Sequence, residues 1–177
     1  MKKIQAAFHA DDDAHYRKLG LIRNQVQVWE DGMRTDGSKG TYEWWYFDSS
    51  YPDGTKLIIF FYSKSPIAVD GPIKPMSTIE LTLPDGRKFE EQVNATIEES
   101  FYSKEKCDIR IGDCRMEGDL KHYSIVFRGK TMSATVSLDN TVPAWRSQCG
   151  PIYFGDKEEY YFNWLPATPE GIAVADV

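Results

Sequence analysis

The chain has 177 residues, of which 41% are hydrophobic and 14% are aromatic. This length suits one domain of the usual ~100–200 residues and excludes two full enzymatic domains, and the composition is too apolar for a disordered chain. The formal net charge is −6, from 21 Lys and Arg against 27 Asp and Glu. Because a nucleic-acid-binding surface needs clustered positive charge to neutralise phosphates, DNA and RNA are not expected partners.

The first 24 residues predict an N-terminal arm with one short helix. Acidic residues 11–13 can cap the start of a helix over 12–19, although a solvated acidic arm is the alternative. No apolar run of signal-peptide length follows the N-terminus, and no segment approaches the ~20 apolar residues of a membrane span. We therefore expect a soluble, cytoplasmic protein with no membrane span.

From residue 25 onward, apolar residues alternate with period two, which predicts strands. Two Pro-Asp-Gly turns, at 52–54 and 84–86, join neighbouring strands into antiparallel hairpins, and the proline-rich segment 65–75 predicts a loop. The expected strands cover 25–28, 41–48, 55–62, 77–83, 88–97, 107–111, 114–120, 123–128, 132–138, 152–154 and 160–164. So many strands in one open sheet would leave long unpaired edges, so an all-β antiparallel barrel or a sandwich is favoured. A barrel of about eight or more strands can hold a small ligand.

The most aromatic of these strands contains a carboxylate. Period-two alternation places Glu43 on one face, with Trp45 and Phe47, and the other aromatic residues on the opposite face. Burial among rings disfavours the ionised form of a carboxyl group, so Glu43 is a candidate general acid. The alternative is an ion pair between Glu43 and an arginine such as Arg110 or Arg115, which would only tie strands together.

Several stretches together resemble the AttH-like, carotenoid 1,2-hydratase (hydroxyneurosporene synthase) family of lipocalin-like proteins. The most specific is Tyr-Glu-Trp-Trp-Tyr-Phe-Asp at 42–48, and the others, in family order, are Trp-Glu-Asp-Gly at 29–32, Lys-Cys-Asp-Ile-Arg-Ile-Gly at 106–112, Gly-Asp-Leu at 118–120, Val-Pro-Ala-Trp-Arg at 142–146 and Ile-Tyr-Phe-Gly-Asp at 152–156. That family has two consecutive lipocalin-like (calycin-type) β-barrels, and this chain resembles the first barrel only.

The resemblance implies a domain organisation and a partner. It assigns residues 25–167 to a lipocalin-like barrel and residues 168–177 to the linker and first strand of a second barrel. A homodimer or a separate second lipocalin-like domain is therefore an expected partner. The family's hydratases, and the related decalin-forming Diels–Alderases, need no metal or redox cofactor, so no cofactor is expected.

The chemistry expected from these residues is hydration, isomerisation or cyclisation of a hydrophobic unsaturated molecule. Glu43 or Asp48 is the candidate proton donor, and aromatic faces can stabilise a developing cation. The candidate ligand-binding residues are Tyr42, Trp44, Trp45, Tyr46, Phe47, Phe60, Tyr62 and Asn163. Two alternatives stay open: a binding module for an apolar ligand without catalysis, and a subunit that pairs with a second barrel.

Metal and disulfide sites are not expected. His9, His15 and His122 are too far apart in the sequence for a metal-binding motif. The three cysteines form no Cys-x-x-Cys pair, and we expect them to be small buried residues.

Overall fold

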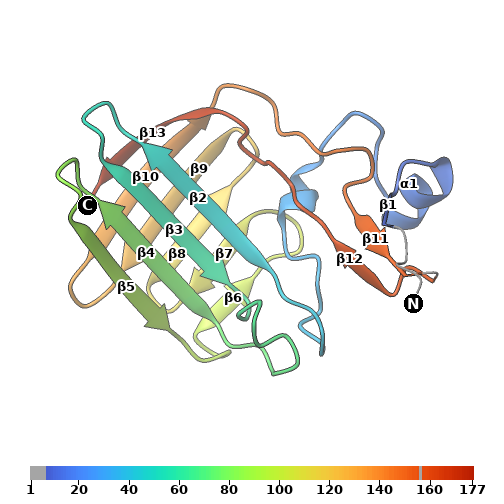
Figure 1. Ribbon diagram of the computed structural model, residues 1–177, viewed down its shortest axis with the longest axis horizontal. Coiled ribbons are helices and arrows are strands. Elements are labelled where there is room, and N and C mark those ends of the chain that lie inside the picture. Colours follow the sequence, from blue (N-terminus) through green and yellow to red (C-terminus); the bar gives the residue numbers. More distant parts are fainter. Residues whose placement is uncertain (1–6, 156) are drawn as a thin grey trace, which may run out of the picture.

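A computed structural model describes residues 7–155 and 157–177, and it is built mainly from antiparallel β-strands (Figure 1). The elements in chain order are β1 (Phe8–His9), α1 (Asp13–Leu19), the 3-10 helix η1 (Val28–Asp31), β2 (Trp44–Ser50), β3 (Lys56–Tyr62), β4 (Met76–Thr82), β5 (Lys88–Asn94), β6 (Ser100–Tyr102), β7 (Asp108–Ile111), β8 (Cys114–Gly118), β9 (His122–Arg128), β10 (Ser133–Asn140), β11 (Ile152–Phe154), β12 (Tyr160–Phe162) and β13 (Gly171–Asp176). The all-β, antiparallel class expected from the sequence is confirmed.

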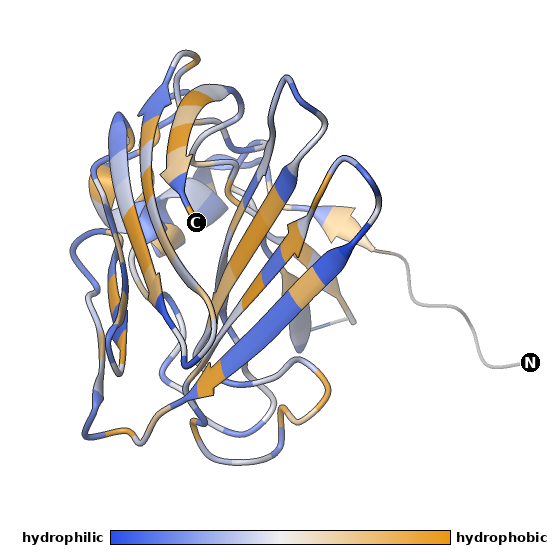
Figure 2. Ribbon diagram, turned by 90° about the vertical axis from the view of Figure 1, so that its left-hand side faces the viewer, coloured by the Kyte–Doolittle hydropathy of each residue, from blue (hydrophilic) through white to orange (hydrophobic). Residues whose placement is uncertain are grey.

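Two large sheets face each other. The first has the strand order β2-β3-β4-β5 and the second has the order β13-β10-β9-β8-β7-β6. Figure 2 shows them from the side as two groups of strands, and the edge strand β5, which faces the viewer there, is largely hydrophilic. A third sheet, β1-β11-β12, lies beside them with α1 (Figure 1).

The two Pro-Asp-Gly turns form the hairpins predicted for them. Gly54 and Gly86 have φ angles of 93° and 86°, a region that glycine enters without a steric penalty. In each turn the aspartate side chain accepts a hydrogen bond from the backbone two residues later, from Thr55 to Asp53 at 2.9 Å and from Arg87 to Asp85 at 3.1 Å. Local chemistry therefore determines the pairing of β2 with β3 and of β4 with β5.

The core lies between the two large sheets and follows the period-two pattern. On β3, Leu57, Ile59 and Phe61 are completely buried, while their neighbours on the strand are less buried. The facing sheet contributes Ile109, Ile111, Met116, Ile125, Phe127 and Val136. The cysteines Cys107, Cys114 and Cys149 are buried free thiols, as expected.

Glu91 on β5 links the two sheets. Its carboxylate accepts hydrogen bonds from the backbone of Lys130, Thr131 and Met132, in the turn between β9 and β10. Partial burial alone would raise the pKa of Glu91, but these backbone donors outweigh that effect and lower the pKa to about 2. The ionised carboxylate therefore holds the edge of one sheet against a turn of the other.

The expected closure into a barrel is not present. The hydrogen-bonded strand orders end at β2 in one sheet and at β13 in the other, so these two edges are not paired with each other in the described ranges. Hydrogen bonding around a full barrel requires a matching tilt and register of all strands, which local alternation does not specify. The result is a pair of opposed sheets with an opening between β2 and β13.

The prediction of a strand at 25–28 is wrong. This segment contains a single isolated bridge, between Ile22 and Gln25, and continues into η1. Gln27 and Glu30 form a reciprocal capping box, and the Glu30 carboxylate also binds Arg146 at 2.7 Å. An ion pair between residues more than a hundred positions apart in the sequence therefore stabilises a 3-10 helix in a segment whose short alternation is typical of a strand.

Some of the remaining elements were predicted from the sequence, and others were not. The helix is confirmed as α1, with Asp12 as its N-cap, and β11 and β12 are the expected aromatic strand pair. The short strands β1 and β6 were not predicted. The tail 168–177, which the resemblance assigned to a second barrel, forms β13 and pairs with β10 in this sheet. In the part of the chain that the structure describes, no helix has the length and apolarity needed to cross a membrane.

Candidate functional site

A groove of about 2040 Å³ runs along the opening between β2 and β13. Pockets for small molecules are typically about 300–1,000 Å³, so this groove is large enough for an extended ligand. Its inner wall, between the sheets, includes Trp45, Phe47, Met116, Tyr123 and Ile125. Its outer part continues over the opposite face of β2 and along the segment from β12 to β13. The groove is therefore the main candidate site.

The inner wall contains a partly buried acid, Asp31. Tyr123 on β9 donates a hydrogen bond from its phenol to Asp31 Oδ2 at 2.6 Å. The residue is positioned by η1 and by Trp45, whose indole Nε1 donates to the Asp31 carbonyl oxygen at 2.9 Å. Both Asp31 and Tyr123 line the groove. A carboxyl group is thereby held against an apolar wall by a strand that lies 92 residues away in the sequence.

Burial changes the protonation of this acid. Desolvation raises the pKa of Asp31 to about 7, the negative charge of Glu43 acts in the same direction, and the Tyr123 hydrogen bond partly opposes both. The same burial, together with the charge of Asp31, raises the pKa of the Tyr123 phenol. Asp31 is therefore an acid that gains or loses a proton near neutral pH, as general acids do.

The second oxygen of Asp31 is open to the groove. Oδ1 accepts no hydrogen bond from the residues that the structure describes. Among the described residues, the fully buried polar side-chain atoms without a hydrogen-bond partner are His9 Nε2, Ser49 Oγ, Tyr51 OH and Asn140 Oδ1, so Asp31 Oδ1 is not fully buried. Asp31 is partly buried and lines the groove, so this oxygen is the one available to a bound ligand.

Glu43, the acid favoured by the sequence, lies just before β2 and is fully engaged. Its carboxylate accepts hydrogen bonds from the backbone nitrogens of Arg34 and Thr35, at 2.8 and 2.9 Å, and from the Thr35 hydroxyl at 2.9 Å. The alternative partners Arg110 and Arg115 instead bind acids on their own sheet. Glu43 therefore ties the loop before it to the start of β2, and it also lines the groove.

The other predicted residues separate onto two faces. Trp45 and Phe47 point into the core, where they are 6% and 5% exposed. The opposite face carries an outer aromatic cluster, with ring centroids 4.7–6.2 Å apart along the chain of contacts: Tyr42, Trp44, Tyr62, Phe60 and Tyr46. This spacing is typical of mutually stabilising aromatic pairs. The aromatic strand thus lines both the inner wall and the outer part of the groove, and Tyr62 lies outside its lining.

Asp48 and Asn163 lie at the outer part of the groove. Asp48 is exposed on the outer face of β2 next to Tyr46, whose pKa is raised mainly by desolvation and also by the Asp48 charge. Asn163 is exposed just after β12, with its side chain close to Gly150. No hydrogen bond among the described residues joins Glu43, Asp48 and Asn163, so the structure does not bring the two sequence-predicted acids and Asn163 into one catalytic cluster.

A row of exposed aromatic residues borders the groove where the chain leaves and re-enters the sheets. Tyr160 is 73% exposed and Trp164 is 65% exposed, and both line the groove. Phe162 and Trp145 belong to the same row, at 43% and 57% exposed. We call these four residues the aromatic rim. Exposed apolar patches of this kind commonly mark binding surfaces.

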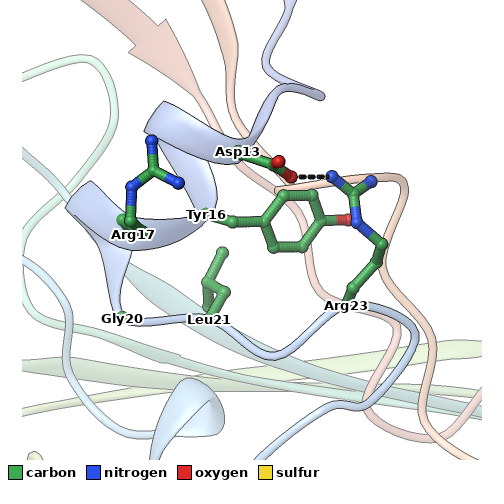
Figure 3. A pocket seen from close by; sticks show the side chains of 6 residues that line it. All are labelled: Asp13, Tyr16, Arg17, Gly20, Leu21 and Arg23. Carbon is green, nitrogen blue, oxygen red and sulfur yellow. Dashed lines mark hydrogen bonds and ion pairs between the residues drawn. The ribbon is translucent and has the colours of Figure 1, made fainter.

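A second, smaller hollow of about 250 Å³ lies under α1 (Figure 3). Asp13 and Arg23 close it with an ion pair of 2.6 Å, and the Arg23 guanidinium lies 4.2 Å from the centre of the Tyr16 ring. It contains none of the predicted site residues. In residues 7–155 and 157–177, no three His, Cys, Asp or Glu side chains converge to hold a metal ion.

Sequence reasoning missed Asp31 and Tyr123. Asp31 lies in the Trp-Glu-Asp-Gly stretch that carried part of the family resemblance, but nothing in its immediate neighbours indicates burial against a distant phenol.

In comparisons with models of protein families, with curated protein sequences and with solved structures, no significant match is found.

Proposed function

We propose that the protein is a cofactor-independent enzyme that acts on a hydrophobic unsaturated small molecule, by hydration, isomerisation or cyclisation, within a lipocalin-like fold. The observation that carries the proposal is the groove between β2 and β13, which combines a large apolar and aromatic lining with an accessible acid. The sequence resemblance to AttH-like, carotenoid 1,2-hydratase proteins supports the same substrate class.

The lining suits an apolar ligand that develops positive charge. Trp45, Phe47, Met116 and Ile125 line the groove, so an apolar ligand lying against them would gain dispersion contacts and lose contact with water. Aromatic faces attract a nearby cation, and this stabilises the intermediate formed when an alkene is protonated. Orientation of a folded substrate against such walls is also sufficient to favour a pericyclic cyclisation.

Two neighbouring positions on β13 provide a matched test of binding. Ala173 packs towards the core and lines the groove, whereas Val174 is 69% exposed on the other face of the strand. Ala173→Phe therefore fills the groove, and Val174→Phe adds the same ring outside it. We would analyse each purified protein by native mass spectrometry, followed by a denaturing run that releases bound small molecules.

The proposal expects an apolar, unsaturated compound on the wild-type protein and on Val174→Phe, and loss of that compound from Ala173→Phe. If purification strips the ligand, the same three proteins are titrated with a polyene fatty acid and followed by tryptophan fluorescence. Equal binding by all three proteins, or no binding by any, would contradict a ligand site in the groove.

A second candidate function is a binding module without turnover. The hydrogen bonds of Glu43 favour this function. Its carboxylate accepts from three donors in the preceding loop, so it is not free to donate a proton to a substrate. Recovery of the bound compound unchanged after long incubation, with no second product, would favour this function over the enzyme.

A third candidate is pairing with a second copy or with a second lipocalin-like domain. The free edges of β2 and β13 and the exposed aromatic rim favour it, because unpaired edges and apolar patches promote association. Sedimentation velocity over a hundredfold concentration range tests the homodimer. A mass that stays at one chain throughout would count against it.

A further inference from the structure

We propose that Asp31 is the proton donor of the groove and that Tyr123 is the residue that positions it. This inference rests on the proposed function and deepens it, because it assigns the step that makes an unsaturated substrate reactive. It transfers the acid role from Glu43 and Asp48, which the sequence favoured, to a carboxyl group that the sequence did not single out.

Six carboxyl groups line the groove, those of Glu30, Asp31, Glu43, Asp48, Glu159 and Glu170. Glu30 is paired with Arg146 at 2.7 Å, and Glu43 is held by loop donors. Asp48, Glu159 and Glu170 are exposed to solvent. Within the described residues, Asp31 alone in this set combines partial burial against an apolar wall with an oxygen that accepts no hydrogen bond.

The two oxygens of the Asp31 carboxyl group have different roles. Oδ2 receives the Tyr123 phenol at 2.6 Å, which fixes the orientation of the carboxyl group. Oδ1 is accessible on the groove side, where a substrate carbon would lie. Because Tyr123 is itself only 7% exposed and packed in the core, the pair is held rigidly by β9 and η1.

The chemical step is balanced without an oxidant or a reductant. The π electrons of the substrate double bond form a new C–H bond with the proton of the Asp31 carboxyl group, and the O–H bond breaks to leave a carboxylate and a carbocation. In a hydration, water forms a C–O bond with the cation and returns one proton to the carboxylate. In an isomerisation, the cation loses a neighbouring proton to the same carboxylate, and the double bond forms at a new position.

The charges around Asp31 support its protonated form in the resting site. The titratable groups that face it are Tyr123 from β9, Cys107 just before β7 and Glu43 just before β2. None of these three groups is a cation, and the guanidinium of Arg34, which lines the same groove, donates to the carbonyl oxygens of Gly32 and Lys104 rather than to Asp31. Activity that needs the protonated acid should therefore be constant at low pH and fall as the pH rises past about 7.

The test uses decyl vinyl ether, an apolar alkene whose hydrolysis begins with transfer of a proton to carbon. Its products, decanol and acetaldehyde, are measured directly, and its binding is measured separately by tryptophan fluorescence. The variants are Asp31→Asn, which keeps the shape and an acceptor for Tyr123, Tyr123→Phe, and Asp113→Asn as a control. Asp113 is exposed in the turn between β7 and β8 and does not line the groove.

We expect wild type and Asp113→Asn to accelerate hydrolysis by about 10²-fold or more over buffer, the usual contribution of a general acid. Asp31→Asn should bind the ether and fall to within about twofold of the buffer rate. Tyr123→Phe should stay active with its pH midpoint displaced upward, because the phenol hydrogen bond lowers the pKa of Asp31. A purely structural role for Tyr123 would not move that midpoint.

The outcomes distinguish this inference from the function on which it rests. If the ether binds and Asp31→Asn is as active as wild type, or wild type gives no acceleration, the assignment of Asp31 is overturned while the ligand groove stands. If the ether does not bind, or binds equally to Ala173→Phe, the proposed groove function fails, and the assignment of Asp31 fails with it.

Discussion

Asp31 should make the stability of the fold depend on pH in a direction opposite to that of most carboxyl groups. Desolvation raises its pKa from 3.8 to about 7, so between these values the folded protein holds a proton that the unfolded chain has lost. The folded state binds more protons in this window, and the free energy of unfolding therefore decreases as the pH rises. Above about pH 7 the decrease is complete, because both states are then ionised.

The magnitude follows from the size of the shift. A rise of about three pKa units, at about 1.4 kcal/mol per unit, corresponds to about 4 kcal/mol of lost stability at high pH. Asp31→Asn removes the titration and keeps an oxygen that accepts the Tyr123 hydrogen bond. Between pH 4.5 and pH 8 the stability of the variant relative to wild type should therefore improve by about 3 kcal/mol.

Urea denaturation at a series of pH values measures this difference, with Asp113→Asn as the matched control. The control should track wild type at every pH, because its carboxyl group is exposed in a turn. A difference between Asp31→Asn and wild type that is the same at pH 4.5 and pH 8 would refute the reasoning. It would mean that the Asp31 carboxyl is hydrated in the folded protein, and the acid proposed for the groove would lose its basis.

Three further predictions concern polar contacts that hold loops and sheet edges of the fold together. Lys64 is 1% exposed and its ammonium donates to four backbone carbonyl oxygens at 2.8–3.0 Å, so Lys64→Met should destabilise the fold by about 3–5 kcal/mol in urea denaturation. Arg146 binds Glu30 and three carbonyl oxygens at 8% exposure, so Arg146→Ala should cost about 3–5 kcal/mol and raise amide hydrogen exchange in η1. The pKa of Glu91 is lowered to about 2, so its contribution is complete above about pH 4.5 and is lost as the pH falls towards 2. Glu91→Gln should therefore lower the melting temperature at pH 7 and have little effect at pH 2.

The parts of the fold that local chemistry determines were predictable. The Pro-Asp-Gly turns identified two hairpins, and alternation along 42–48 placed Trp45 and Phe47 on one face and Trp44 and Tyr46 on the other. The same alternation was misleading at 25–28, because a run with only two apolar residues carries little information. There the side chain of Arg146, more than a hundred residues away, holds Glu30 and favours a 3-10 turn.

The site itself was only partly predictable. The aromatic residues of the groove were evident from composition, whereas the acid depends on which segments pack together. Asp31 becomes a candidate acid only through its hydrogen bonds with Tyr123 and Trp45. These residues come together because the two sheets pack against each other, which the sequence near Asp31 does not show. Whether the edges of β2 and β13 meet also depends on the register of all strands between them, which no single segment encodes.

The open edge also couples binding to acidity in the proposed mechanism. Asp31 lines the groove, so an apolar substrate that fills the groove further shields the carboxyl group from water. Further desolvation of the ionised form raises the pKa again, so the bound complex should hold the proton to a higher pH than the free protein. Because kcat/KM reports ionisation in the free enzyme and kcat reports it in the complex, the kcat profile should fall at the higher pH. Coincident midpoints would show that the substrate leaves the carboxyl group hydrated, and proton transfer from Asp31 would then require water between the acid and the double bond.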